Sequence, residues 1–384
     1  MILRINSLFG GALTLIFLAS SIPAMTYNNE VNSVSTDKEL TTNLSLYQDI
    51  DNIVIENAEK AVVSVINYDK NGNYYGLGSG VIFKSEGSFQ YLITNYHVVE
   101  DGATFEVVSW DMQRVYGIVI GYDSIQDCAV IRIPKLENAN VAVIGDSSLV
   151  VVGEEVFAIG NPADISLKNT ITRGIVSGLN RVVNETGTYL EQQKHAIQLD
   201  LAINPGNSGG ALFNEYGELI GINTLKLTSD GGTAKYEGIN LALPISDMFL
   251  AANRILSSAI IANDGTLLQN GTYTKSSLGI ANFYSLRDIS LSQRNQLNIP
   301  SSVISGVLVR NIYGVLSNPL NTNNIGEDSI IVSYNGTNVV DKVQLRSLVY
   351  NTLIGTNVSL TILKKVNNSY QTIVVTTKIV QSQY

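Results

Sequence analysis

A serine flanked by glycines is the residue of this chain best suited to nucleophilic chemistry. Ser208 lies in the segment Asn204-Pro-Gly-Asn-Ser-Gly-Gly-Ala-Leu. A serine hydroxyl attacks well only when a base removes its proton and nearby donors stabilise the oxyanion. Gly206 and the pair Gly209-Gly210 permit a sharp turn that aims the N–H groups of Gly206 and Ser208 at one point. The segment predicts a nucleophile with an oxyanion hole; its alternative is a tight hairpin that happens to contain serine.

The base that such a serine needs must be one of only two histidines. His97 follows the apolar run Leu92-Ile-Thr-Asn-Tyr, where a strand should end and a loop begin. His195 follows the polar stretch Glu191-Gln-Gln-Lys, which we interpret as a solvated loop. We therefore expect His97 to be the base and His195 to have no part in the chemistry.

A third group has to hold the other ring nitrogen of the imidazole. Asp127 directly precedes the apolar run Cys128–Ile133, so its carboxylate should lie beside the core. Asp123, four residues earlier, is a rival that spacing alone does not exclude. Either choice gives the chain order His, Asp, Ser, which is the order of chymotrypsin and differs from that of subtilisin and the α/β-hydrolases.

Cys128 is the single cysteine of the chain, so no intramolecular disulfide can form. Because it lies within an apolar run, we expect a small buried hydrophobe on a strand and not a nucleophile.

Composition bounds the remaining function classes. Of 384 residues, 45% are hydrophobic and 15% charged, which suffices for two ordinary domains with sizeable cores. Acidic residues outnumber basic ones by 33 to 24, giving a net charge of −9. A nucleic-acid partner is therefore not expected, because binding a polyanion requires a basic face.

The first residues are typical of an export signal. Arg4 precedes an apolar stretch from Leu8 to Ile22, which is short for a membrane span. Residues 1–25 are predicted to be a signal peptide or an uncleaved N-terminal anchor, and residues 26–50 a polar linker. Both interpretations place the rest of the chain outside the cytoplasm, either secreted or anchored to the outer face of the cell membrane.

Short β-rich runs separated by glycine and asparagine fill the region from 51 to 260, which indicates an all-β barrel or sandwich. A helix with Ser246 as its N-cap should close this domain near residue 260. Residues 261–276 are predicted to be a linker. Residues 277–384 mix strands with a helix at Lys342–Tyr350, and Asn335-Gly336 predicts a hairpin turn.

Seven segments in order along residues 75–245 resemble the HtrA/Deg family of trypsin-like serine proteases. They are Gly78-Ser-Gly-Val-Ile-Phe, Thr94-Asn-Tyr-His-Val-Val, Asp127-Cys-Ala-Val-Ile-Arg-Ile, Ala158-Ile-Gly-Asn-Pro, Thr170-Ile-Thr-Arg-Gly-Ile-Val-Ser, Gln198-Leu-Asp-Leu-Ala-Ile-Asn-Pro-Gly-Asn-Ser-Gly-Gly and Gly238-Ile-Asn-Leu-Ala-Leu-Pro-Ile. Departures are mild, such as Tyr96 before the histidine where the family more often has asparagine.

This resemblance implies a mainly β fold of two six-stranded, chymotrypsin-like barrels with the active site between them. It selects Asp127 as the acid, because the family's triad acid precedes that strand. It further implies endoproteolysis of unfolded or misfolded proteins without ATP, no metal or organic cofactor, and assembly as trimers. The loop from Asn180 to Lys194 matches the family's regulatory loop, with Arg181 where a sensor arginine often lies; a solvated arginine is an equally good interpretation.

The C-terminal part resembles an α+β PDZ domain. Leu278-Gly279-Ile280 is similar to the loop that binds a peptide's terminal carboxylate, and the later strands and helix follow in PDZ order. Such domains bind free C-termini by adding them as a strand to a sheet edge. Two other functions stay open at this point: a protease that cuts one signalling substrate when a peptide reaches this domain, and a holdase chaperone whose triad is mostly latent.

Overall fold

The computed structural model describes most of the chain from residue 52 onward. The described residues are 52–162, 165–182, 194–224, 229–230, 233–234, 239–262, 266–272, 275–312, 320 and 325–381. The predicted signal or anchor and the polar linker, residues 1–25 and 26–50, lie outside these ranges. Across the described ranges, no helix has the length and apolar character that a membrane span requires.

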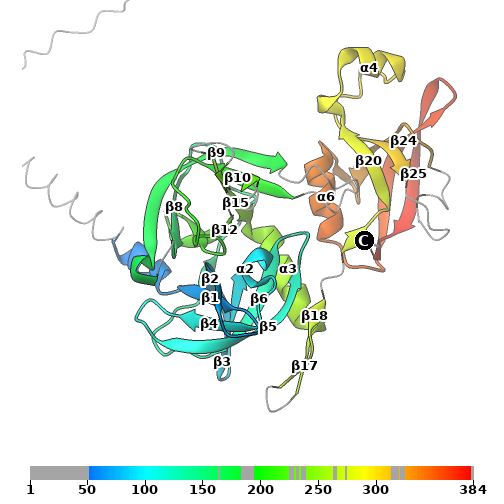
Figure 1. Ribbon diagram of the computed structural model, residues 1–384. Coiled ribbons are helices and arrows are strands. Elements are labelled where there is room, and N and C mark those ends of the chain that lie inside the picture. The colour runs from blue at the N-terminus through cyan, green and yellow to red at the C-terminus, as the bar shows by residue number, and fades with distance from the viewer. Residues whose placement is uncertain are drawn as a thin grey trace, which may run out of the picture. The chain divides into compact units, whose positions relative to one another are not determined.

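Six antiparallel strands form the first barrel, in the order β5-β4-β1-β2-β3-β6, and a pairing between β5 and β6 closes it (Figure 1). Alternate residues of β1 enter different cores, because successive side chains point to opposite faces of a strand. Val63 and Val65 lie in the barrel interior, and Val62 faces the core shared with the second barrel. The strands are β1 Val62–Tyr68, β2 Tyr74–Glu86, β3 Phe89–Thr94, β4 Thr104–Val108, β5 Arg114–Asp123 and β6 Cys128–Pro134.

The second barrel has the order β11-β8-β9-β10-β15-β12 and closes through a pairing of β11 with β12. The short β7 (Val143–Ile144) pairs in parallel with β12. The prediction of two six-stranded, chymotrypsin-like barrels is confirmed. The strands are β8 Glu155–Gly160, β9 Thr170–Val182, β10 His195–Leu199, β11 Ala211–Asn214, β12 Glu218–Thr224 and β15 Asn240–Pro244.

Helix α3 (Ile245–Ser258) packs its apolar stripe on the core that the two barrels share. Its buried residues Ile245, Met248, Ala252 and Ile255 recur at helical spacing. The predicted N-cap Ser246 is wrong by two positions: the cap residue is Pro244, because β15 runs directly into the helix and leaves no loop.

Two β-rich runs of the sequence form a strand over only part of their length. The run from Tyr91 to Val99 is strand only to Thr94, and Tyr96–Val99 forms the helical turn α2. Asn95 follows the strand and is the N-cap residue of α2, and its buried side chain donates to the backbone carbonyl of Asp127 at 3.1 Å. The run from Ile197 to Ile203 is strand only to Leu199.

The C-terminal domain has its own sheet, in the order β20-β21-β22-β24-β25, and its own apolar core. The predicted Asn335-Gly336 turn is confirmed: both residues have positive φ (48° and 81°), and Tyr334 pairs with Thr337 across it. Helix α6 contributes the buried Leu345 and Val349 to the core. The elements are β20 Ile280–Ser285, η3 Leu286–Asp288, α4 Leu291–Gln296, β21 Val307–Ile312, β22 Ser329–Tyr334, β23 Thr337–Asn338, α6 Lys342–Tyr350, β24 Asn357–Val366, β25 Ser369–Lys378 and β26 Val380–Gln381.

The predicted linker at 261–276 contains short strands that tie the domains together. β18 (Gly271–Thr272) adds to β5 of the first barrel, and β19 (Ser276–Ser277) pairs with β26 at the end of the C-terminal domain. β16 (Ile260–Ile261) pairs with β17 (Leu267–Gln269). Both barrels and the C-terminal sheet belong to one compact unit.

His195 corrects the sequence interpretation. Instead of lying in a solvated loop, it begins β10, pairs with Val182 of β9 and is only 4% exposed. A polar flank in the sequence did not reveal a strand whose partners lie elsewhere in the chain. Burial lowers the pKa of His195 to about 4, with further lowering by the charges of Arg346 and Lys342 and opposition from Asp247.

This burial predicts a pH-dependent loss of stability. The unfolded chain binds a proton at the ordinary histidine pKa of about 6.5, and the folded chain resists it down to about 4, so stability falls as the pH drops through that window. The full loss corresponds to about 3 kcal/mol, since each pKa unit is about 1.4 kcal/mol. Thermal unfolding of the wild type and His195→Gln between pH 8 and pH 4 tests this. The wild type should lose more stability than the variant, and parallel pH profiles would contradict the prediction.

Candidate active site

The carboxylate of Asp127 holds the imidazole of His97. Nδ1 of His97 lies 2.9 Å from Oδ2 and 3.0 Å from Oδ1 of Asp127, and the backbone N–H of His97 donates to the same carboxylate at 3.0 Å. Asp127 is only 1% exposed. An imidazole bound to a carboxylate through Nδ1 presents Nε2 as a base and gains stability when it is protonated.

A tight connection between β5 and β6 presents Asp127. Asp123 and Cys128 pair across it, and Asp127 has φ of +56°, a left-handed conformation that few non-glycine residues adopt. Oδ1 of Asp123 accepts the backbone N–H groups of Ile125 and Gln126 at 2.9 and 3.1 Å. The rival acid of the sequence analysis therefore organises the turn, while Asp127 contacts the histidine.

The loop that carries Ser208 is bound to strand β2 beside the histidine. The N–H of Ser79 donates to the Ser208 carbonyl at 2.8 Å. A Cβ added to the neighbouring Gly78 would lie 2.6 Å from a methyl of Val98 and 3.2 Å from the Ser208 carbonyl oxygen. The serine loop and the helical turn that carries His97 therefore both pack against Gly78 of strand β2. This packing brings the segments of Ser208 and His97 close together.

The backbone at Gly206, two residues before Ser208, has a positive φ and is held by a hydrogen bond from the first barrel. Gly206 has φ of +98°, and its carbonyl accepts the Ser79 hydroxyl at 2.8 Å. That hydroxyl accepts the backbone N–H of Asn161 at 2.9 Å. The side chain of Asn161 in turn donates to the Val63 carbonyl at 2.9 Å. A buried polar chain therefore runs from the first barrel to the turn that precedes Ser208.

Several supporting residues were not singled out as site residues from the sequence. Thr224, fully buried at the end of β12, donates its hydroxyl to Oδ2 of Asp127 at 3.4 Å. Thr94 donates its hydroxyl to the Ser79 carbonyl at 2.6 Å. Ser79 and Asn161 lie in segments that carry the family resemblance, so the sequence did contain a signal for these two residues. It contained none for Thr224, because the partner of Thr224 is 97 residues away.

Arg181 lies in β9, where its guanidinium donates to Oε1 of Gln198 on the neighbouring β10 at 2.8 Å. The greater part of the predicted regulatory loop, residues 183–193, lies outside the described residues. Arg181 thus occupies the strand that leads into that loop.

The predicted carboxylate loop of the C-terminal domain combines a left-handed glycine with buried neighbours. Gly279 has φ of +72°, and its N–H donates to the hydroxyl of Ser277 at 2.8 Å. Leu278 and Ile280 are buried and share a core cluster with Leu345 of α6.

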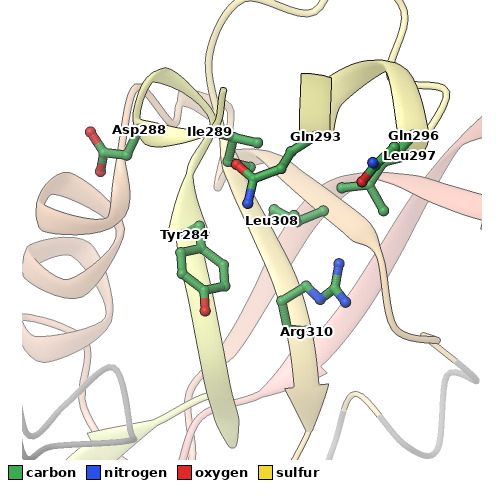
Figure 2. A pocket seen from close by; sticks show the side chains of 8 residues that line it. All are labelled: Tyr284, Asp288, Ile289, Gln293, Gln296, Leu297, Leu308 and Arg310. Atoms are coloured by element: carbon green, nitrogen blue, oxygen red, sulfur yellow. The ribbon is translucent and has the colours of Figure 1, made fainter. Parts of the chain in front are cut away.

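A cavity of about 470 Å³ lies elsewhere in the C-terminal domain, between β20, β21 and α4 (Figure 2). Leu308 and Leu297 form part of its lining, with Tyr284 at one side, and Arg310 forms an ion pair with Asp328 at 2.8 Å. Its lining also includes the polar side chains of Asp288, Gln293 and Gln296.

Cys128 is fully buried on β6, as predicted, and its thiol points to the Met248 carbonyl at 3.7 Å. Burial raises the pKa of this thiol well above its usual value, which keeps it protonated and unreactive.

Comparison with known proteins identifies the family to which this chain belongs. Residues 78–222 match the trypsin-like peptidase domain. The chain is 32% identical to the serine protease Do-like HtrA of Lactococcus lactis subsp. cremoris, over 94% of this chain and 91% of that protein. It is 31% identical to the Do-like HtrB of Bacillus subtilis, over 88% of this chain and 72% of that protein. The chain belongs to the HtrA family of serine proteases.

Solved structures agree with this assignment to the HtrA family. The HtrA-type protease AlgW, solved with a tripeptide, superposes with a TM-score of 0.65 at 26% identity, over 86% of this chain and 97% of that one. A serine endoprotease from Yersinia pestis gives a TM-score of 0.56 at 27% identity, over 87% and 98%. The HtrA-family chain is accordingly a serine endopeptidase.

The serine loop leaves no room for a side chain at Gly209, which generates a prediction. Gly209 has φ of +84°, and an added Cβ would lie 2.1 Å from the Ser79 carbonyl oxygen. Gly209→Ala should therefore displace the loop and lower kcat/KM for an unfolded substrate by about 100-fold or more.

Gly72→Ala is the matched control, because Gly72 has φ of +79° with no atom within 4 Å of an added Cβ. It should lose only about 1 kcal/mol of stability, from the left-handed backbone alone, and keep its activity. Equal kcat/KM values for the two variants would show that crowding at Gly209 does not matter.

Proposed function

We propose that this HtrA-family enzyme cuts unfolded or misfolded proteins outside the cytoplasm, without ATP, through Ser208, His97 and Asp127. The observation that carries the proposal is the hydrogen bond between Asp127 and Nδ1 of His97 at 2.9 Å. The segment that carries His97 lies beside the glycine-rich turn of Ser208. This arrangement supports acyl transfer, because it supplies a nucleophile, a base and a group that orients the base.

In the proposed reaction, Ser208 Oγ attacks the carbonyl carbon of the scissile bond while Nε2 of His97 takes the hydroxyl proton. Negative charge develops on the carbonyl oxygen, where the N–H groups of Gly206 and Ser208 would bind it. The C–N bond breaks as His97 gives its proton to the leaving amine, which leaves an acyl-enzyme. Water, deprotonated by His97, then releases the acid and restores the serine.

We further propose that the C-terminal domain is a PDZ domain that binds free C-termini. One support is Gly279, which has a left-handed backbone and directly precedes the edge strand β20. The other is helix α6, whose Leu345 and Val349 lie in the same apolar core as Ile280. The AlgW structures are described as complexes with a tripeptide and with a decapeptide. In this chain a carboxylate would accept the Gly279 N–H in place of the Ser277 hydroxyl.

Replacement of the nucleophile tests the triad. Ser208→Ala should abolish casein cleavage and labelling by a fluorophosphonate probe, with an unchanged melting temperature. His97→Ala should lose about as much activity as Ser208→Ala, because triad members act as a unit. Without added peptide, the wild type should label at Ser208. Casein cleavage by Ser208→Ala near the wild-type rate would refute the assignment.

Peptide binding to the full-length Ser208→Ala protein tests the C-terminal domain. Calorimetry should show micromolar affinity, about −8 kcal/mol, for peptides with free apolar C-termini. Amidation of the C-terminus should weaken binding by about tenfold, because a charge-assisted set of hydrogen bonds is lost.

Gly279→Val should weaken binding as amidation does. Gly355→Val is its control, since Gly355 has φ of +90° in the same domain with no atom within 4 Å of an added Cβ. Equal affinity for acid and amide peptides would mean that this domain does not recognise C-termini.

A further inference from the structure

The loop that presents Asp127 is held by residues that come much later in the chain. Gln126, the neighbour of Asp127, is only 4% exposed, and its Oε1 accepts a hydrogen bond from Nη2 of Arg346 at 3.1 Å. Arg346 lies on α6 of the C-terminal domain, 220 residues away in sequence. A direct contact therefore joins that helix to the residue beside the proposed triad acid.

Arg346 is fixed on several sides and is itself buried, with 3% exposure. Its Nη1 donates to Oδ2 of Asp247 in the first turn of α3 at 2.8 Å, and its guanidinium lies 5.0 Å from the ring centre of Tyr350. The side chain of Arg346 is 3% exposed and that of Asp247 is 17% exposed, so loss of Asp247 would leave a buried charge without this partner. Arg346 thus offers Gln126 a donor with little freedom to move.

The other end of the same turn receives a second cation. Nζ of Lys275, which precedes β19, lies 3.8 Å from Oδ2 of Asp123, and both side chains are buried. Oδ1 of this aspartate accepts the backbone N–H groups within the turn. Two buried polar side chains of the turn, Asp123 and Gln126, thus contact cations that follow the barrels in sequence.

Asp127 needs such support because its left-handed backbone is unfavourable for a residue with a Cβ. That conformation costs about 1–2 kcal/mol, and the turn must be held by its surroundings to keep it. The hydrogen bonds of Asp123 hold the start of the turn, and the bond from Arg346 holds Gln126, directly before Asp127.

We infer that Arg346 is a positioning residue for catalysis: through Gln126, the C-terminal domain orients the carboxylate of Asp127 toward His97. The inference rests on the proposed role of Asp127 in the triad. Loss of the contact between Arg346 and Gln126 should lower the rate of the chemical step in every enzyme molecule and leave substrate binding unchanged. A residue that served only the fold would instead reduce the fraction of competent molecules.

The test compares Arg346→Met and Gln126→Met in the full-length protein. Each should react with a fluorophosphonate about tenfold more slowly than the wild type, yet reach complete labelling of Ser208. With casein, kcat should fall by a similar factor and KM should stay within about twofold. Gln126→Met keeps the ion pair between Arg346 and Asp247, so it gives an answer even where Arg346→Met does not fold.

Two comparisons make the result specific. The double variant should be no more than about twofold slower than either single variant, because both remove one contact. Arg310→Met is the control, since it removes an arginine–aspartate ion pair at 2.8 Å that lies within the C-terminal domain, and it should label at the wild-type rate.

Labelling of both variants within twofold of the wild-type rate would overturn the inference. So would incomplete labelling in which the reactive fraction keeps the wild-type rate, since that marks a purely structural role. Asp127→Asn separates this failure from failure of the proposed triad: it should label at least about 100-fold more slowly if Asp127 is the triad acid. Fast labelling of Asp127→Asn would refute the triad itself.

Discussion

The hydrogen bond between Asp127 and His97 is the interaction on which the other features of the site depend. It joins a carboxylate that is 1% exposed to a ring nitrogen at 2.9 Å. A buried carboxylate needs several donors to remain charged, and the structure supplies them from the His97 backbone, its ring and Thr224. His97 lies on α2 of the first barrel and Thr224 on β12 of the second, so both barrels supply donors to this carboxylate.

The two barrels meet at this bond for reasons of packing. Their shared core combines Val62 and Val130 of the first barrel with Phe157 and Phe213 of the second, whose rings stack at 5.3 Å. Polar hydrogen bonds beside this core then connect the two barrels and fix the turn of the serine loop. Asn161 reaches from the second barrel to the Val63 carbonyl of the first, and Ser79 fixes the turn before Ser208.

The C-terminal domain contributes to the same region through buried charges. Arg346 and Asp247 form their pair beside Gln126, and the charge of Arg346 also lowers the pKa of the buried His195. A hydrogen bond from a buried arginine is strongly directional, because the planar guanidinium fixes its donors. The proposed triad acid and the proposed peptide-binding domain are therefore linked by a short chain of contacts: α6, Arg346, Gln126 and Asp127.

The short apolar runs predicted an all-β barrel or sandwich, and the resemblance to the HtrA/Deg family specified two six-stranded barrels. Local patterns also predicted the nucleophile loop, from glycines around a serine, and the buried state of Cys128, from a cysteine within an apolar strand. The sequence alone also determined His97 as the better of two candidate bases. Asp123 and Asp127 could not be separated by spacing, since both precede the same strand and only the turn decides which carboxylate faces the ring. Tertiary structure likewise decided the burial of His195, the support of Asp127 by Thr224 and the contact of Arg346 with Gln126. Each joins residues distant in sequence, and no local periodicity records which side chains a folded chain brings together.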